Sequence, residues 1–267
     1  FFARLRLCVK VAFISDLHFD HNPGLLPVLE DRLREISVDV LVLGGDLFSG
    51  FSRLGTALSR LHQIVPHVVF LPGNHDLWIH ETATGIDSRQ LYETILPRVA
   101  ATAEVHYLGL HPVIIEDLAF VGVTGWYEDD PQGQLQSSDA TFCVWPDFPS
   151  PLDVLTWQLE LLESQLCKAE TQVDRIFVIT HTVAFVQLLA DSIHKDLQPY
   201  MGSNRLGEII LHHPKVVYAV SGHLHARFLF SILPRALPWE ISPFGYPNEL
   251  GKNAREIMAQ SLRILHF

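Results

Sequence analysis

Five short apolar runs, each ending directly at polar or glycine residues, restrict the possible folds of this chain more than any other feature of its sequence. The runs cover residues 9–15, 38–43, 67–71, 176–179 and 216–220. They are rich in β-branched residues and have the length of buried strands. Between the first two runs, apolar residues recur at helical spacing, at Leu25, Leu29, Leu33 and Ile36. Strands that alternate with amphipathic helices are typical of layered α/β proteins.

The rest of the chain continues this alternation. We expect a helix over residues 153–170, and strands near residue 105, over 113–123 with a turn at 116–117, and over 228–232 as the closing strand. The sequence contains neither an internal repeat nor a low-complexity linker, and its 48% of hydrophobic residues can supply a sizeable core. The sequence therefore predicts a single domain over residues 1–267.

One segment, from Trp126 to Pro151, interrupts the alternation. It is rich in Asp, Gln, Ser and Pro, yet it contains five aromatic residues. A long irregular segment inside a compact domain is usually either functional or disordered, and the aromatic content argues against disorder. We predict a lid or insertion loop at about 126–151, with Trp126 or Tyr127 bordering the functional cleft.

Polar clusters directly follow the five apolar runs. They are Asp16-x-His18, Gly45-Asp46, Gly73-Asn74-His75-Asp76, His181 and Gly222-His223-x-His225. Taken singly, each cluster can be explained as an ordinary turn, because Gly and Asn are turn residues. In layered α/β proteins, however, ligands bind outside the carboxyl ends of the strands. The five clusters together therefore predict one site where carboxylate, amide and imidazole groups meet, and imidazole is the commonest metal ligand.

In their order along the chain, these motifs resemble the signature of the calcineurin-like metallophosphoesterases. The resemblance extends over residues 9–225, and the tail motif over 245–249 is similar to bacterial and plant members. It implies an α/β fold: a four-layer αββα sandwich of two mixed β-sheets flanked by helices.

The resemblance also implies two divalent transition metal ions, Mn, Fe or Zn. The first metal would be held by Asp16, His18 and His225. The second would be held by Asn74, His181 and His223, with Asp46 bridging the two ions. A mixed set of nitrogen and oxygen donors without thiolate suits these metals. Two ions about 3.5–4 Å apart can hold a phosphoryl group and generate the attacking hydroxide between them.

Two further residues are candidates for catalysis. His75 follows a predicted ligand without being one itself, so it is free to act as the general acid for the leaving group. The alternative for His75 is a hydrogen bond that merely holds Asn74. Asp76 is the candidate for orienting His75.

The bridging-aspartate motif departs from that of the Ser/Thr protein phosphatases in this superfamily. Those enzymes continue the motif with a further Asp and an Arg, whereas Asp46 is followed here by Leu47, Phe48, Ser49 and Gly50. The departure disfavours a phosphoprotein substrate and favours a small-molecule phosphate ester. We therefore expect an enzyme that hydrolyses phosphomonoesters or phosphodiesters. The alternative is a catalytically silent scaffold for protein binding, a class that usually loses ligands, whereas all seven are present here together with His75. The substrate, the native metal pair and the oligomeric state stay open.

Charge and cysteine content bear on partners and location. The formal net charge of −11 disfavours nucleic acid and anionic lipid as partners. No apolar run has the roughly 18 residues that a membrane span needs. Three cysteines without a CxxC pair argue against a disulfide framework and fit a reducing, cytoplasmic location. His212 and His213, which precede Pro214, are interpreted as helix-capping or solvent-exposed side chains.

Overall fold

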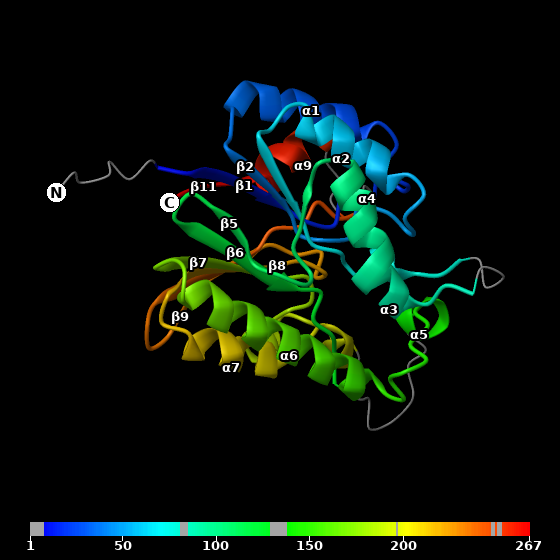
Figure 1. The fold of residues 1–267 in the computed structure, drawn as a ribbon, viewed down its shortest axis with the longest axis vertical. Coiled ribbons are helices and arrows are strands. Elements are labelled where there is room, and N and C mark those ends of the chain that lie inside the picture. Colours follow the sequence, from blue (N-terminus) through cyan, green and yellow to red (C-terminus); the bar gives the residue numbers. More distant parts are fainter. Residues whose placement is uncertain (1–7, 81–84, 129–137, 196, 247–248, 250–252) are drawn as a thin grey trace.

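Two β-sheets stack face to face at the centre of the computed structural model (Figure 1), which describes residues 8–80, 85–128, 138–195, 197–246, 249 and 253–267. The strand order in the first sheet is β11 (Arg263–His266), β1 (Lys10–Ile14), β2 (Val40–Leu43), β3 (His67–Phe70) and β4 (His106–Tyr107). The order in the second is β5 (Val113–Ile115), β6 (Leu118–Val123), β7 (Arg175–Thr180), β8 (Val216–Ser221), β10 (Leu237–Ile241) and β9 (Phe228–Ile232).

Both sheets are mixed. In the first sheet, β1 to β4 run parallel and β11 pairs antiparallel with β1. In the second, β6, β7, β8 and β10 run parallel, and β5 and β9 are antiparallel strands at the two edges. The parallel strands need crossover connections, and helices provide several of these.

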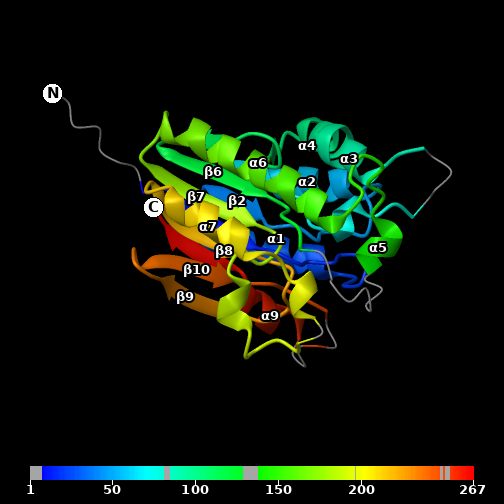
Figure 2. The ribbon, with the colours of Figure 1, turned by 90° about the horizontal axis from the view of Figure 1, so that it is seen from below.

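Helices cover the outer face of each sheet and complete four layers. Over the first sheet lie α1 (Leu25–Ile36), α2 (Leu54–His62), α4 (Leu96–Thr102) and α9 (Ala254–Ser261). Over the second lie α6 (Pro151–Glu170) and α7 (Asn204–His212), which Figure 2 shows side by side. An apolar core between the sheets includes Phe13, Val42, Phe120 and Phe177. The predicted fold class is confirmed.

The remaining helical elements are short. They are η1 (His75–Leu77), α3 (Ser88–Gln90), the π-helical turn η3 (Leu91–Ile95), α5 (Ser138–Phe142), η4 (Val186–Leu189) and η5 (Gln198–Tyr200).

Local sequence explains where the longer helices form. Helix α1 buries Leu25, Leu29 and Leu33 on one face, as the spacing predicts. Helix α6 begins after Ser150, whose side chain accepts from the Asp153 N–H in a reciprocal capping box. The predicted start of α6 was two residues late.

The C-terminal part of the second sheet differs from the prediction. Strand β9 does not close the fold, because the chain returns as β10 and then continues through α9 to β11. The sequence of β10 includes Pro238 and Glu240, residue types that are uncommon in strands, so its sequence does not predict a strand. Glu240 is nevertheless buried, where it accepts from Tyr218 Oη at 2.9 Å and pairs with Arg263. These partners offset the cost of burying a carboxylate.

No described helix is long and apolar enough to cross a membrane. The three cysteines are free thiols in the structure. The single-domain prediction stays a prediction, although the core between the sheets joins residues from both halves of the chain.

Candidate metal centre

The loops that follow β1, β2, β3, β7 and β8 bring all seven predicted ligands together. Four of these ligands, Asp16, His18, Asp46 and His223, have a positive φ between 40° and 66°. A positive φ is strained for a residue other than glycine, and strain of this kind clusters at functional sites. The tight turns therefore serve to direct these side chains to one point.

The first group consists of Asp16, His18 and His225, whose donor atoms lie within 4.8 Å of one another. His18 Nε2 is 3.3 Å from His225 Nε2, and His225 Nε2 is 3.6 Å from Asp16 Oδ1. Asp16 and His18 are fully buried. This group is the predicted first ligand set.

The second group consists of Asn74, His181 and His223. The amide oxygen Asn74 Oδ1 lies 2.9 Å from His181 Nε2 and 3.0 Å from His223 Nδ1. Asp46 stands between the two groups: its Oδ1 is 3.3 Å from His181 Nε2, and its Oδ2 is 3.8 Å from His18 Nε2. The carboxylate thus directs one oxygen toward each group.

Ring hydrogen bonds orient three of the four histidines in these groups. His181 Nδ1 donates to Gly44 O at 2.8 Å, and His223 Nε2 donates to Tyr200 O at 2.9 Å. His225 Nδ1 donates to Glu249 Oε2 at 2.7 Å. In each case the other ring nitrogen is directed into the group. Metal-binding histidines are held in this way, by a carbonyl or carboxylate on the second nitrogen.

The sequence of residues 9–227 matches the family described as calcineurin-like phosphoesterase. The chain belongs to this family. Membership indicates a metal-dependent phosphoester hydrolase, and the two groups of Asp, Asn and His side chains provide donors that such an enzyme needs. No curated protein matches the chain in sequence.

Solved structures with the same fold include the phosphopantetheinyl hydrolase PptH from Mycobacterium tuberculosis. It is 20% identical, with a TM-score of 0.75 over 96% of this chain and 95% of that one. The protein TT1561 of Thermus thermophilus is 16% identical, with a TM-score of 0.56 over 97% and 99%. A dimetal phosphatase from Danio rerio is 13% identical, with a TM-score of 0.52 over 87% and 86%. At these identities the likeness concerns the fold.

The carboxylates of this family member control the protonation of its histidines. Burial would lower the pKa of His181, but the charges of Asp46 and Asp16 raise it to about 10. Burial would likewise lower the pKa of His225, but Asp16 and Glu249 raise it to about 9. Both imidazoles are therefore protonated at neutral pH when no cation is bound.

These pKa values predict that metal binding releases protons. Because only neutral imidazole binds a metal, His181 and His225 should together release close to two protons per chain at pH 7.5. The apparent metal affinity should then rise with pH until about 9–10. Titration calorimetry in buffers of different ionisation enthalpy measures the release, and His225→Gln should lower it by about one proton. A release that is independent of pH between 7 and 9 would contradict the assignment.

The same values predict how the metal-free chain responds to alkali. Both folded-state pKa values lie above the unfolded value of about 6.5. The stabilisation from the two imidazolium groups is therefore complete below about pH 6.5 and is lost as the pH rises through 9–10.

His75 lies beside the two groups and is partly exposed, with 15% of its side chain accessible. Its Nε2 is 3.9 Å from Asp46 Oδ2, and its Nδ1 is 3.5 Å from Ser49 Oγ. Its ring stacks on Trp78, with the centroids 3.7 Å apart. The imidazole thus has a fixed orientation at the accessible side of the centre.

Asp76 does not occupy the position that we predicted. Its Oδ2 accepts from the backbone N–H groups of Asp46 and Gly73, and its Oδ1 accepts from those of Leu47 and Phe48. Burial and the charge of Asp46 raise the pKa of Asp76 to about 7, while the backbone donors favour its ionised form. We expected Asp76 to orient His75, but its carboxylate instead fastens the loop after β2 to the loop after β3.

The C-terminal tail supports the metal centre, which the sequence did not predict. The ring of Tyr246 stacks on that of His18, with the centroids 4.5 Å apart, and Glu249 accepts a hydrogen bond from His225. The Gly245 N–H donates to Asp16 O at 2.9 Å. These residues belong to the tail motif noted in the sequence, so a signal was present, but their contacts depend on the tertiary fold.

Asp139 on α5 is a second support of the centre that the sequence did not predict. Its Oδ1 accepts from Asn74 Nδ2 at 2.8 Å and from Trp78 Nε1 at 2.7 Å. It therefore fixes which way the Asn74 amide points, and it also holds the ring that stacks on His75. No sequence motif marks Asp139, which is 65 residues from Asn74.

Asp139→Ala should weaken metal binding by the group that contains Asn74. The Asn74 amide would be free to rotate, so we expect the affinity of this group for a metal ion to fall about 10–100-fold. The partly buried N–H of Trp78 would lose its acceptor, at a cost of about 1 kcal/mol of stability. Asp139→Asn should largely preserve both, because its side-chain oxygen can accept both bonds. Metal titration and thermal unfolding check this, and wild-type affinity in Asp139→Ala would contradict it.

The described part of the predicted lid packs against the domain. Trp126 and Tyr127 are only 3% and 4% exposed and belong to the core of the second sheet. With Asp139 and Cys143 they line a cavity of about 240 Å³. The prediction that Trp126 or Tyr127 borders the functional cleft stays a prediction, and residues 129–137 lie outside the described part of the chain.

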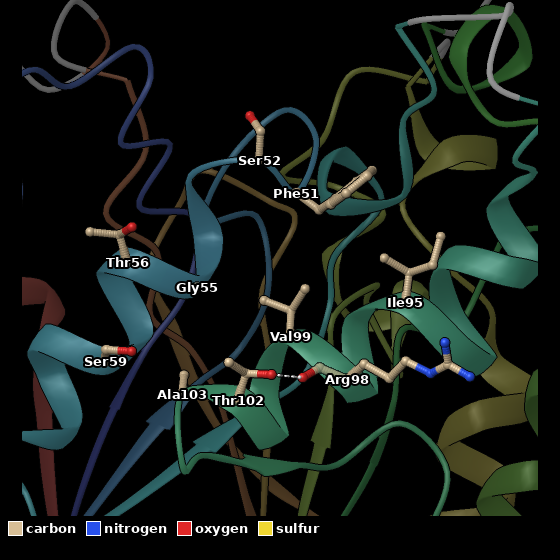
Figure 3. A pocket seen from close by; sticks show the side chains of 10 residues that line it. All are labelled: Phe51, Ser52, Gly55, Thr56, Ser59, Ile95, Arg98, Val99, Thr102 and Ala103. Atoms are coloured by element: carbon tan, nitrogen blue, oxygen red, sulfur yellow. Dashed lines mark hydrogen bonds between the residues drawn. The ribbon is translucent and has the colours of Figure 1, made fainter.

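A cavity of about 620 Å³ between α2 and α4 lies apart from the metal centre (Figure 3). None of the predicted ligands lines it. Its walls include Phe51, Thr56 and Val99, together with Arg98, whose carbonyl oxygen accepts from Thr102 Oγ1 at 2.9 Å. Cavity size alone therefore does not locate the chemistry of this protein.

Proposed function

We propose that this chain hydrolyses small-molecule phosphate esters at a dinuclear centre in which Asp46 bridges two divalent transition metal ions, Mn, Fe or Zn. Asp16, His18 and His225 hold one ion, and Asn74, His181 and His223 hold the other. The observation that carries the proposal is the position of Asp46, with one oxygen directed toward each group.

The residues present fit such a centre. The buried His18 Nδ1 has no hydrogen-bond partner, while its Nε2 faces His225 Nε2. Two imidazole nitrogens 3.3 Å apart beside carboxylates are suited to sharing a cation. When bound, the two ions supply Lewis acidity toward the phosphoryl oxygens and lower the pKa of bound water.

His75 is proposed to give a proton to the leaving-group oxygen. Trp78 and Ser49 contact its imidazole and set its orientation. A donor that is partly exposed beside the centre can reach the ester oxygen as the bond to phosphorus breaks, which avoids release of an unstable alkoxide.

A small cavity adjoins this donor. It measures about 180 Å³, and its walls include Ser49, Phe51, Trp78 and Ile79. Because the leaving group must lie on the side of the proton donor, we propose that this cavity accepts part of that group. Its mixed walls favour a compact organic substituent over a protein segment.

The loop after Asp46 also argues for a small molecule. Leu47 and Phe48 are buried at 0% and 6% exposure, and Asp76 binds their backbone N–H groups. These positions therefore belong to the framework and provide no charged side chain for a phosphoprotein. The solved neighbour named phosphopantetheinyl hydrolase supports a hydrolase role and adds phosphopantetheinyl esters to the test.

The test is a substrate panel with the Mn²⁺-loaded protein. It should contain aryl phosphomonoesters, aryl phosphodiesters, nucleotides, cyclic nucleotides and a phosphopantetheinyl ester. We expect hydrolysis that disappears on chelation and returns with Mn²⁺. Activity that survives complete metal removal, or a metal-replete protein inactive on the whole panel, would contradict the proposal.

A further inference from the structure

A second cluster of metal-binding side chains lies between α6 and α7, apart from the centre described above. Glu163, Cys167 and Glu170 are spaced so that they fall along one face of α6. His213 follows the last residue of α7 and faces them. Donor atoms of Glu163, Cys167 and His213 lie within 4.8 Å of one another. The two helices are adjacent on the outer side of the second sheet (Figure 2).

His213 is the C-cap residue of α7, as its capping interpretation expects, but its side chain is buried in this cluster and not exposed to solvent. It is only 6% exposed, its Nε2 is 3.3 Å from Glu163 Oε2, and its Nδ1 is 3.1 Å from Glu170 Oε2. His213 Nδ1 is close to Glu170 but makes no well-aligned hydrogen bond. The buried Glu170 Oε1 makes none either. His212, by comparison, is exposed and donates to Glu208 O at 2.7 Å within its own helix.

The backbone that carries His213 is held in place from the other side. The guanidinium of Arg235 donates to His213 O at 2.8 Å and to Ile210 O at 3.1 Å. The Lys215 ammonium likewise donates to two backbone carbonyl oxygens and forms an ion pair with Asp174. These cations are bound to other groups, so they do not take the place of a cation between Glu163 and His213.

Two distances in the cluster are close to those between neighbouring ligand atoms of a tetrahedral zinc ion. Zinc binds sulfur at about 2.3 Å and nitrogen or oxygen at about 2.0–2.2 Å, so its ligand atoms stand about 3.3–3.6 Å apart. Here His213 Nε2 is 3.3 Å from Glu163 Oε2, and Cys167 Sγ is 3.6 Å from Glu163 Oε1. Glu170, on the other ring nitrogen, occupies the place of the carboxylate that orients a metal-bound histidine.

We propose that Glu163, Cys167 and His213 form a further metal site that binds Zn²⁺ and fastens the C-terminal half of α6 to the end of α7. A water molecule completes the coordination on the exposed side. Burial and the charge of Glu163 raise the pKa of the Cys167 thiol, so zinc displaces a proton from that sulfur and binds more tightly as the pH rises. This site is independent of the proposed hydrolytic function.

The thiol makes the site distinguishable from the phosphoesterase centre. Thiolate bound to Co²⁺ gives an intense near-ultraviolet charge-transfer band, whereas a centre of nitrogen and oxygen donors gives none. Protein titrated with Co²⁺ after the phosphoesterase centre has been filled with Mn²⁺ should develop this band. Cys167→Ser should abolish it, and the exposed Cys8 provides the matched control, because Cys8→Ser should retain it.

Ligand variants and metal counting complete the test. His213→Gln and Glu163→Gln should each lower the affinity of this site more than about tenfold. Glu160→Gln makes the same charge change at an exposed position of α6 and should not affect the affinity. Elemental analysis should give one more zinc per chain in wild type than in Cys167→Ser. With the phosphoesterase centre filled with Mn²⁺, zinc should raise the melting temperature of wild type more than that of Cys167→Ser.

Two results would overturn the proposal. The first is the absence of a charge-transfer band in wild type at saturating Co²⁺, or an equal band in Cys167→Ser. The second is equal thermal stabilisation of wild type and Cys167→Ser by zinc, together with lower metal-free stability of His213→Gln. That second pattern would show a protonated His213 bridging Glu163 and Glu170 without a metal.

Discussion

Asp46→Asn should remove both metal ions together and abolish most of the hydrolytic activity. The side chain keeps its shape but loses the charge that offsets repulsion between two cations. We expect the metal content to fall from about two per chain to well below one at micromolar free metal. Without the two ions the transition state loses several kcal/mol of stabilisation, which corresponds to a fall of about 10²–10⁴-fold in kcat/KM. Elemental analysis after gel filtration and a phosphoesterase assay measure the two effects.

The control for this variant is Asp31→Asn. Asp31 lies on α1 with 52% of its side chain exposed, so the substitution makes the same charge change away from the site. It should keep both metals and full activity. If Asp46→Asn loses one ion and retains the other at wild-type affinity, Asp46 belongs to a single ion and the bridging assignment is wrong.

His75→Asn should lower kcat by roughly 10²–10⁴-fold while both metals stay bound, because that range is the usual contribution of general acid catalysis. Asn cannot give up a proton to the leaving group. The effect should therefore be large for alkyl esters, whose leaving groups are poor, and small for nitrophenyl esters, which leave without protonation. A series of substrates with graded leaving-group pKa values, together with metal analysis of the variant, provides the measurement.

Two outcomes would assign His75 a different role. An equal loss for good and poor leaving groups would exclude proton donation. Loss of a metal would support the alternative in which His75 merely holds Asn74 in place. His62→Asn is the matched substitution, because His62 is at the end of α2 and pairs with Glu104, and it should behave as wild type.

Much of the fold could be predicted because its signals are local. The apolar runs before Asp16, Asp46 and Asn74 are strands, and their length and β-branched content suffice to show it. The strands β10 and β11 lack such a signal. Glu240 of β10 and Arg263 of β11 form an ion pair between the two sheets, and each segment taken alone has a charged residue within a short apolar pattern.

The support of the site could not be predicted for a related reason. Asp139 on α5, and Tyr246 and Glu249 in the C-terminal tail, contact the ligands from positions distant in the chain. The tail motif is visible in the sequence, but which ligands its residues contact depends on the tertiary fold. Asp76 shows the converse error: its position beside His75 in the sequence suggested a contact, but the 3₁₀ turn directs its carboxylate to the backbone instead.

The sequence by itself determined which side chains could form the metal centre, because parallel strands bring their carboxyl ends to one edge and the ligands stand at those ends. Only the tertiary structure decided how each ligand is held and where other chemistry is possible. The fixing of Asn74 by Asp139 and the burial of His213 against α6 depend on packing between elements far apart in the chain. Local periodicity carries no information about such contacts, because it reports which face of an element is buried and not what lies against it.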